Sequence, residues 1–357
     1  MDQIKLILED GIAISGSFFG HPSSVAGEVV FNTAMTGYPE SLTDPSYKGQ
    51  ILVLTYPLIG NYGVPENIIE NSLSKYFESN KAQISGLIIA NYSTEYNHWN
   101  ANKSLEDWLF ENKIPAMASV DTRALTKKIR EKGALKGKLI YENQDVDFYD
   151  PDQDNLVSQV SCTQKITYGM GRNKILLVDC GVKNNIIRHL LKRDATVIRV
   201  PWNYNFLSEE YDGIFLSNGP GNPVHCVETV NYIAQAMDKE IPIFGICLGN
   251  QLMAMASGAK TYKLKYGHRG HNQPVLLNNT NKAYITSQNH GFAIDQDTLS
   301  SDWVPLFINL NDNTNEGIKH KYKPFFSVQF HPEASSGPTD TEFLFDDFID
   351  LIEKHKK

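Results

Sequence analysis

The chain has few cysteines, no long apolar run and no excess of positive charge, and each shortage excludes a class of protein. Its four cysteines are widely spread and form no Cys-x-x-Cys pair, which argues against a disulfide framework or a structural zinc site. No stretch of 18 apolar residues is present, so no transmembrane helix is expected. The opening MDQIKLILEDG lacks the basic flank and apolar core of a signal peptide. We therefore predict a cytoplasmic protein.

The charge balance and the absent motifs restrict the possible partners. Lysine and arginine number 33 against 41 acidic residues, a formal charge of −8, which argues against nucleic acid or an anionic membrane as the main partner. No phosphate-binding loop of the form GxxxxGK[ST] occurs, because the pair Gly137-Lys138 is followed by a leucine. We expect no cofactor on this chain, and we expect ATP chemistry to belong to another chain.

The first part of the chain is rich in strand signals. The segment KLILEDGIAISGSFFG predicts a hairpin that turns at Asp10-Gly11, and further strands are predicted over 51–55 and 84–90. Two helices are predicted, SLEDWLFEN with Ser104 as its cap and DTRALTKKIREKG with Asp121 as its cap. These elements predict a strand-rich α/β domain.

The composition changes near residue 142, and the 357 residues favour two domains. Residues 142–154 carry six acids and no base, which is typical of a solvated connection. We predict an N-terminal domain over 1–150, a linker over 151–172 and a second domain over 173–357.

The second domain alternates short apolar strands with helices. KILLVDCG, ATVIRVPW, YDGIFLSNGPG and IPIFGIC are the strand candidates, and three of them end near glycine. This order predicts a mainly parallel sheet flanked by helices. In such sheets ligands bind at the carboxyl ends of the strands.

The segment IPIFGICLGNQ places Cys247 between Gly245 and Gly249, after a strand and before the helix-compatible run LGNQLMAMAS. A strand-to-helix elbow exposes a nucleophile, and a helix N-terminus favours the thiolate. An isolated cysteine is more often a small buried hydrophobe. That is how we interpret Cys162, Cys180 and Cys226.

A nucleophilic cysteine needs a base and an oxyanion hole. In FFSVQFHPEASSGP an apolar strand leads to His331, and Glu333 two residues later would orient the ring. The Leu248 N–H and the loop SNGPGNP, residues 217–223, are candidate oxyanion donors. Taken alone, the HPE segment and the glycine loop are each equally typical of a turn.

Together, GICLGNQ, HPE and SNGPG resemble the class I (triad) glutamine amidotransferases. The resemblance implies an enzyme that hydrolyses glutamine to glutamate and ammonia through a glutamyl thioester. It implies Cys247 as nucleophile, His331 as acid and base, and Glu333 as the orienting group.

Longer segments narrow the resemblance to the small, glutaminase subunits of carbamoyl phosphate synthetase. These are FNTAMTGYPESLTDPSYKGQILVLTYPLIGNYG, VDTRALTKKIREKGALKG, DCGVKNNIIRHLL, KYGHRGHNQPV and SQNHGFAI. The resemblance implies that glutamine is bound by Ser46, Gly219, Gly221, Leu248, Gln251, Asn289, Gly291 and Phe292. Two positions depart from the family pattern, Asn250 where many relatives have histidine and Asn222 where many have aspartate.

The resemblance also implies a large synthetase subunit that makes carbamoyl phosphate from bicarbonate, MgATP and the ammonia released here. It leaves open whether the product feeds arginine synthesis, pyrimidine synthesis or both. The N-terminal domain is the expected docking element. His268 and His271 lack an accompanying carboxylate or cysteine set, so we predict no metal site.

Three alternatives remain beside this interpretation. They are an amidotransferase that serves another synthase, a pseudo-glutaminase that only stabilises or regulates its partner, and a cysteine hydrolase that acts on other amides.

Overall fold

The computed structural model describes residues 3–356 and divides into two compact units, with the boundary between Asp154 and Asn155. The predicted linker over 151–172 is therefore wrong. Helix α4 (Val157–Val160) and strand β14 (Ile166–Tyr168) lie inside that range, and β14 pairs with the sheet of the second unit. The acidic composition suggested a solvated connection, but the apolar residues that follow it are used for packing.

The first unit is built on a closed barrel in the order β1-β13-β3-β4-β9-β12-β2. Strands β3, β4, β9 and β12 are parallel neighbours, and the other pairs are antiparallel. The barrel strands are β1 (Gln3–Leu8), β2 (Ala13–Gly20), β3 (Val25–Asn32), β4 (Gln50–Leu54), β9 (Gly86–Ile88), β12 (Pro115–Ala118) and β13 (Leu135–Tyr141). Closure removes the exposed edges that an open sheet would leave.

The predicted local elements of this unit are confirmed. Strands β1 and β2 form the hairpin, and β4 and β9 fall within or beside the predicted ranges. Helix α2 (Leu105–Glu111) begins after Ser104, whose Oγ accepts from Asp107 N at 3.0 Å. Helix α3 (Thr122–Lys132) begins after Asp121 and ends at a glycine in the left-handed region.

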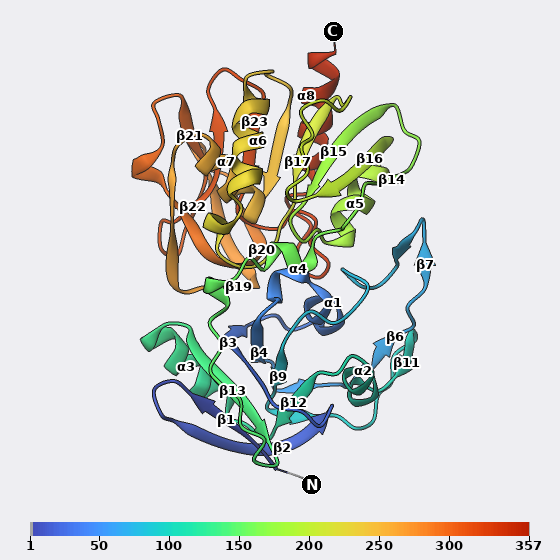
Figure 1. Cartoon of the computed structure of the whole chain (residues 1–357), viewed down its shortest axis with the longest axis vertical. Coiled ribbons are helices and arrows are strands. Elements are labelled where there is room, and N and C mark those ends of the chain that lie inside the picture. Colours follow the sequence, from blue (N-terminus) through green and yellow to red (C-terminus); the bar gives the residue numbers. More distant parts are fainter. Residues whose placement is uncertain (1–2, 357) are drawn as a thin grey trace. The chain divides into compact units, whose positions relative to one another are not determined.

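Smaller elements complete the first unit between its barrel strands. These are α1 (Tyr38–Thr43), the short 3-10 turn Pro45–Tyr47, β5 (Leu58–Ile59), β6 (Val64–Pro65), β7 (Ile69–Glu70), β8 (Leu73–Ser74), β10 (Asn91–Tyr92) and β11 (Ala101–Lys103). Figure 1 shows them as the short arrows and coils around the barrel in blue and cyan.

The second unit contains one sheet in the order β14-β16-β15-β17-β18-β23-β22-β21-β19-β20. Its strands after β14 are β15 (Asn173–Asp179), β16 (Ala195–Pro201), β17 (Gly213–Leu216), β18 (Ile243–Ile246), β19 (Lys260–Leu277), β20 (Ala283–Asp295), β21 (Trp303–Asn309), β22 (Asn315–His320) and β23 (Phe325–Val328). Strands β16, β15, β17, β18 and β23 are parallel, as predicted. The strands from β22 to β20 extend the sheet in antiparallel pairs.

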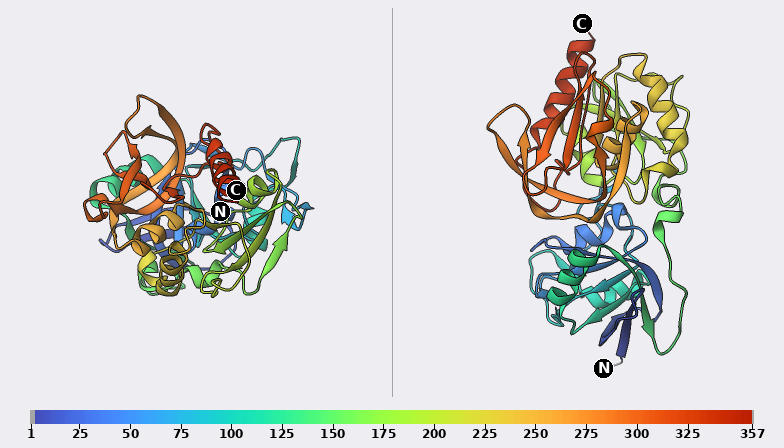
Figure 2. Two further views of the ribbon diagram at one scale, coloured as in Figure 1. Left: turned by 90° about the horizontal axis from the view of Figure 1, so that it is seen from above. Right: turned by 90° about the vertical axis from the view of Figure 1, so that its left-hand side faces the viewer.

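Helices cover both faces of this sheet, which Figure 2 shows in two further views. They are α5 (Asn184–Leu191), α6 (Val227–Met237), α7 (Leu248–Ala256) and α8 (Phe343–His355). Side chains alternate along a strand. Leu216 accordingly packs in one core with Leu252 of α7 and Ile233 of α6, while Phe215 contacts Phe345 and Phe348 of α8. Among the described residues, no helix is long and apolar enough to cross a membrane.

Candidate active site

Cys247 lies on a strained turn between strand β18 and helix α7. Its φ of 54° and ψ of −105° are outside the regions that side chains favour. The flanking glycines explain how the chain makes this turn. A Cβ on Gly245 would lie 2.7 Å from the carbonyl oxygen of Gly249, and a Cβ on Gly249 would lie 2.3 Å from the carbonyl oxygen of Leu216. Glycine at both positions lets the helix approach the sheet closely enough to hold the elbow.

The thiol of Cys247 is buried and interacts with strand β20. Its Sγ donates to the carbonyl oxygen of Asn289 at 3.7 Å, and its backbone N–H donates to Val328 O at 2.8 Å. Leu248 is the first residue of α7, so its N–H has no acceptor within the helix. Gly219 lies beside Leu248, because a Cβ on Gly219 would come within 2.8 Å of Leu248 Cδ2. The two predicted oxyanion elements are therefore neighbours.

His331 and Glu333 form a short, buried pair, with Nδ1 of the ring 2.6 Å from Oε1 of the carboxylate. Burial lowers the pKa of His331, but the Glu333 charge and the Cys247 thiol outweigh burial and raise it to about 10. Nε2 of His331 has no fully formed hydrogen bond. The Cys247 thiol acts on this ring and raises its pKa, and catalytic hydrogen bonds often form fully only when substrate binds.

Lys183 completes this group, and sequence reasoning missed it. Its Nζ lies 3.0 Å from Oε1 of Glu333 and donates to the carbonyl of Ala334 at 2.6 Å. Burial raises the pKa of Glu333, but Lys183 and His331 lower it to about 2. Glu333 is therefore a carboxylate and can hold the His331 ring. Lys183 lies in the DCGVKNN segment, but no feature of the neighbouring sequence predicts its contact with Glu333.

Gln251 is held by a buried amide network. Its Nε2 donates to the carbonyl of Phe292 at 3.0 Å and to Oε1 of Gln329 at 3.1 Å. Asn250 Nδ2 donates to the same Gln329 oxygen at 3.1 Å, and Ser327 Oγ donates to Asn250 Oδ1. Since a backbone carbonyl only accepts, Phe292 fixes the orientation of the Gln251 amide. The Gln251 amide oxygen is left as an acceptor, and Asn250 acts as a support.

The other predicted glutamine-binding residues divide between the units. Gly221 has a φ of 80° and packs against Leu156, and Gly291 lies against the guanidinium of Arg269. Both belong to the second unit, as does Asn289. Ser46 belongs to the first unit, where its N–H donates to Asp44 Oδ1 at 2.9 Å. Its contact with glutamine stays a prediction.

The remaining cysteines, Cys162, Cys180 and Cys226, are held as neutral thiols by burial. Burial raises the pKa of Cys162 and of Cys226 to about 12 in each case, and it raises the pKa of Cys180 well above its ordinary value. These three side chains are therefore protonated thiols, which agrees with their interpretation as structural residues. All four cysteines are free.

An elbow cysteine beside a carboxylate-bound histidine, on a parallel sheet, is the arrangement of the triad amidotransferases. The family description "Glutamine amidotransferase class-I" matches residues 176–351. A second description, "Carbamoyl-phosphate synthase small chain, CPSase domain", matches residues 6–139. The chain belongs to the carbamoyl-phosphate synthase small chain family, and the predicted resemblance is confirmed.

Curated relatives support this family membership over nearly the full sequence. The arginine-specific small chain of carbamoyl phosphate synthase from Debaryomyces hansenii is 48% identical, with 100% of this chain and 87% of that protein covered. "Carbamoyl-phosphate synthase [ammonia], mitochondrial" from Homo sapiens is 55% identical over 98% of this chain, and "Multifunctional protein CAD" from Squalus acanthias is 53% identical over 97%. The chain spans only 24% and 16% of the length of these last two proteins.

Proposed function

We propose that this chain is the glutaminase component of a glutamine-hydrolysing carbamoyl phosphate synthase. The observation that carries the proposal is the 2.6 Å contact between His331 and Glu333 beside the strained Cys247 elbow. A chain that only supported a synthetase would need neither a nucleophile in a costly backbone conformation nor a buried, charged histidine next to it.

Cys247 begins the reaction by attack on the side-chain carbonyl carbon of glutamine. The raised pKa of His331 leaves its ring protonated on both nitrogens, so Cys247 attacks as a thiolate paired with this imidazolium, whose Nδ1–H stays bonded to Glu333. The negative oxygen of the tetrahedral intermediate is stabilised by the Leu248 N–H and by the glycine loop at Gly219.

His331 then donates its Nε2 proton to the leaving nitrogen, so ammonia departs and a glutamyl thioester remains on Cys247. Water activated by the same imidazole attacks the thioester and releases glutamate. The Gln251 amide oxygen is available to accept from the ammonium group of glutamine, and Ser46, Gly221, Asn289, Gly291 and Phe292 complete the proposed binding set.

The ammonia would serve a large synthetase chain that uses bicarbonate and MgATP to form carbamoyl phosphate. The first unit is the proposed docking element, because its residues 6–139 match a description specific to this family rather than to amidotransferases in general. Loss of residues 1–145 should then abolish binding of the large chain, and full affinity without them would refute this assignment.

A second candidate function follows from the relative whose printed name gives ammonia as its substrate. In that case this chain would stabilise or regulate a synthetase without hydrolysing glutamine. The complete set of Cys247, His331 and Glu333 favours the glutaminase.

The test is ammonia release from glutamine by the purified chain, alone and with the large chain, bicarbonate and MgATP. We expect strong release in the complex. Cys247→Ser should abolish glutamine-dependent synthesis and leave ammonia-dependent synthesis intact. No release from a demonstrably formed complex would support the second candidate, and loss of both activities in Cys247→Ser would give this residue a structural role.

The proposed location is the reducing cytoplasm. Four free cysteines without a disulfide support it, and fractionation of the source cells would test it.

A further inference from the structure

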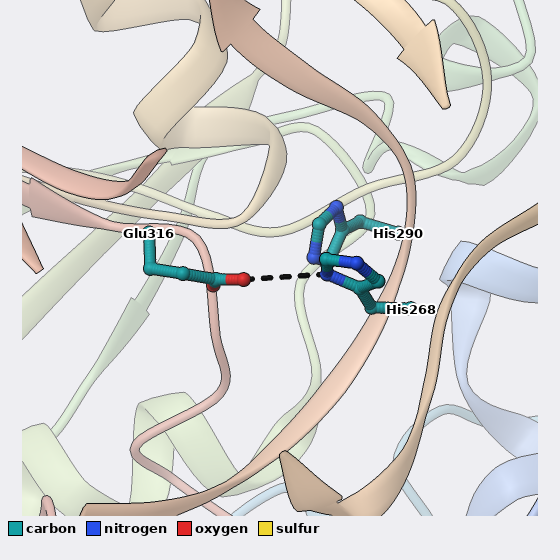
Figure 3. Close-up of side chains that lie close together, drawn as sticks. All are labelled: His268, His290 and Glu316. Atoms are coloured by element: carbon teal, nitrogen blue, oxygen red, sulfur yellow. Dashed lines mark ion pairs between the residues drawn. The ribbon is translucent and has the colours of Figure 1, made fainter. Parts of the chain in front are cut away.

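A second group of buried polar side chains lies in the antiparallel part of the sheet of the second unit. His268 on β19 pairs in register with His290 on β20, and Glu316 on β22 faces them (Figure 3). One potential ligand atom from each residue lies within 4.8 Å of the others, and all three residues are buried. From the sequence, His268 was considered only together with its neighbour His271, and no carboxylate ligand accompanied them. The fold supplies that carboxylate from Glu316.

The hydrogen bonds of His290 define which nitrogen is available. Nδ1 lies 2.8 Å from the carbonyl oxygen of Phe292, so the proton is on Nδ1. The His290 ring lies edge-to-face with the His268 ring, with centroids 4.9 Å apart, and two positive rings so close would repel each other, so His290 is neutral and its Nε2 carries a lone pair. That lone pair lies 3.1 Å from Oε1 of Gln288.

Two acceptors therefore face each other at this point. Gln288 donates its amide nitrogen to Thr286 Oγ1 at 3.2 Å, and Thr286 donates its own proton to the carbonyl of Gln273. These two hydrogen bonds fix the orientation of the Gln288 amide, with its oxygen toward His290. A pair of facing acceptors is unfavourable unless a positive species lies between or beside them.

The other side of the group has the same shortage of positive charge. His268 Nε2 is bonded to Asp312 Oδ2 at 2.8 Å, and its Nδ1 lies 3.3 Å from Oε1 of Glu316. Oε2 of Glu316 is buried without any partner. Each nitrogen of the His268 ring therefore faces a carboxylate, so one positive ring serves two negative groups, and a fully buried oxygen of Glu316 is left unsatisfied.

We propose that His268, His290 and Glu316 form a binding site for a zinc-type transition-metal dication. Two imidazoles and one carboxylate suit zinc and its neighbours better than magnesium or calcium. Bonds of about 2.0–2.1 Å in a tetrahedron place ligand atoms about 3.3 Å apart, and His268 and Glu316 already have that separation. On binding, the ion takes the place of the proton on His268 Nδ1, which passes to solvent.

The outer contacts match those of metal-bound histidines. Each ring has its second nitrogen bonded to an oxygen, Asp312 for His268 and the Phe292 carbonyl for His290, and such contacts fix the ring and its tautomer. Asp312 is partly exposed, so it gives the ion a path from solvent. A bound ion would tie β19, β20 and β22 together next to Asn289 and Phe292, the segment that contacts Cys247 and Gln251.

Zinc binding to the full chain tests the proposal without any measurement of glutaminase activity. All variants are made in a Cys247→Ala background, so that the reactive thiol cannot take the metal. After removal of metal with a chelator, zinc is titrated and the bound metal is counted. We expect one ion per chain, weakened at least about 100-fold by Glu316→Gln and about 10–100-fold by the outer-sphere change Asp312→Asn.

His320→Asn, on the same strand as Glu316 but outside the group, is the matched control and should bind normally. Cobalt in place of zinc should give the visible spectrum of a nitrogen and oxygen site without thiolate bands. Circular dichroism verifies folding, and Asp312→Asn keeps the test decisive if Glu316→Gln does not fold. Absence of stoichiometric zinc, thiolate bands with cobalt, or equal binding by the folded variants would overturn the proposal.

Discussion

The close packing of helix α7 on the sheet predicts that Gly249→Ala damages catalysis as well as stability. Gly249 has no left-handed backbone requirement, so the effect of the new methyl group is purely steric. The methyl carbon would lie 2.3 Å from the Leu216 carbonyl oxygen, against an ordinary contact of 3.4 Å or more. The start of α7 must therefore move by about 1 Å, since the obstacle is backbone and not a flexible side chain.

Cys247 and the Leu248 N–H stand directly before this position, so both move with the helix. A displacement of about 1 Å of a reacting group costs about 100-fold in rate, and overpacking costs about 1–3 kcal/mol of stability. We expect kcat for ammonia release in the complex to fall about 100-fold. Ammonia-dependent synthesis by the same complex should persist, because it does not use the elbow.

Gly258→Ala, just after the other end of α7, is the matched control. Gly258 has a φ of 91° but no atom within 4 Å of an added Cβ. We expect backbone strain of about 1 kcal/mol, a melting temperature lowered by about 2–4 °C and an unchanged kcat. If Gly249→Ala folds and retains kcat within a fewfold of the wild type, the argument that the glycine pair positions the nucleophile is wrong.

The remaining predictions concern the histidine pair and the amide network. His331→Asn should lower kcat by about 10²–10⁴-fold and Glu333→Gln by less, because His331 transfers the proton whereas Glu333 only orients the His331 ring. Steady-state rates in the reverse order would contradict these roles. Gln329→Leu should raise KM for glutamine about tenfold with kcat nearly unchanged, because Gln251 loses its support, and an unchanged KM would remove Gln329 from the site. The pKa of His331, raised to about 10, means that its stabilising charge is complete below 6.5 and is lost as pH rises through about 10. Urea unfolding at about pH 6 and about pH 10 should therefore show a smaller loss of stability in His331→Asn than in the wild type, and equal losses would refute the charged pair.

Structural features that depend on only a few neighbouring residues could be predicted from the sequence. Ser104 and Asp121 cap their helices because a cap is a contact over three residues. The Cys247 elbow and the His331–Glu333 pair could be predicted for the same reason, because all residues of each lie within a short segment. The parallel strands followed from their short apolar runs and the helices between them.

Only the tertiary structure decided which distant side chains meet. Lys183 reaches Glu333 across 150 positions of sequence, and Gln251 meets Gln329 across 78. His268, His290 and Glu316 come from three strands, and no spacing in the sequence relates them. The unit boundary at Asp154 also depended on packing, because an acidic segment is compatible with both a linker and a domain surface. Local backbone and capping preferences act over a few residues, whereas burial brings together groups from the whole chain. The chemistry of single motifs could therefore be predicted from the sequence, but the residues that contact those motifs could not.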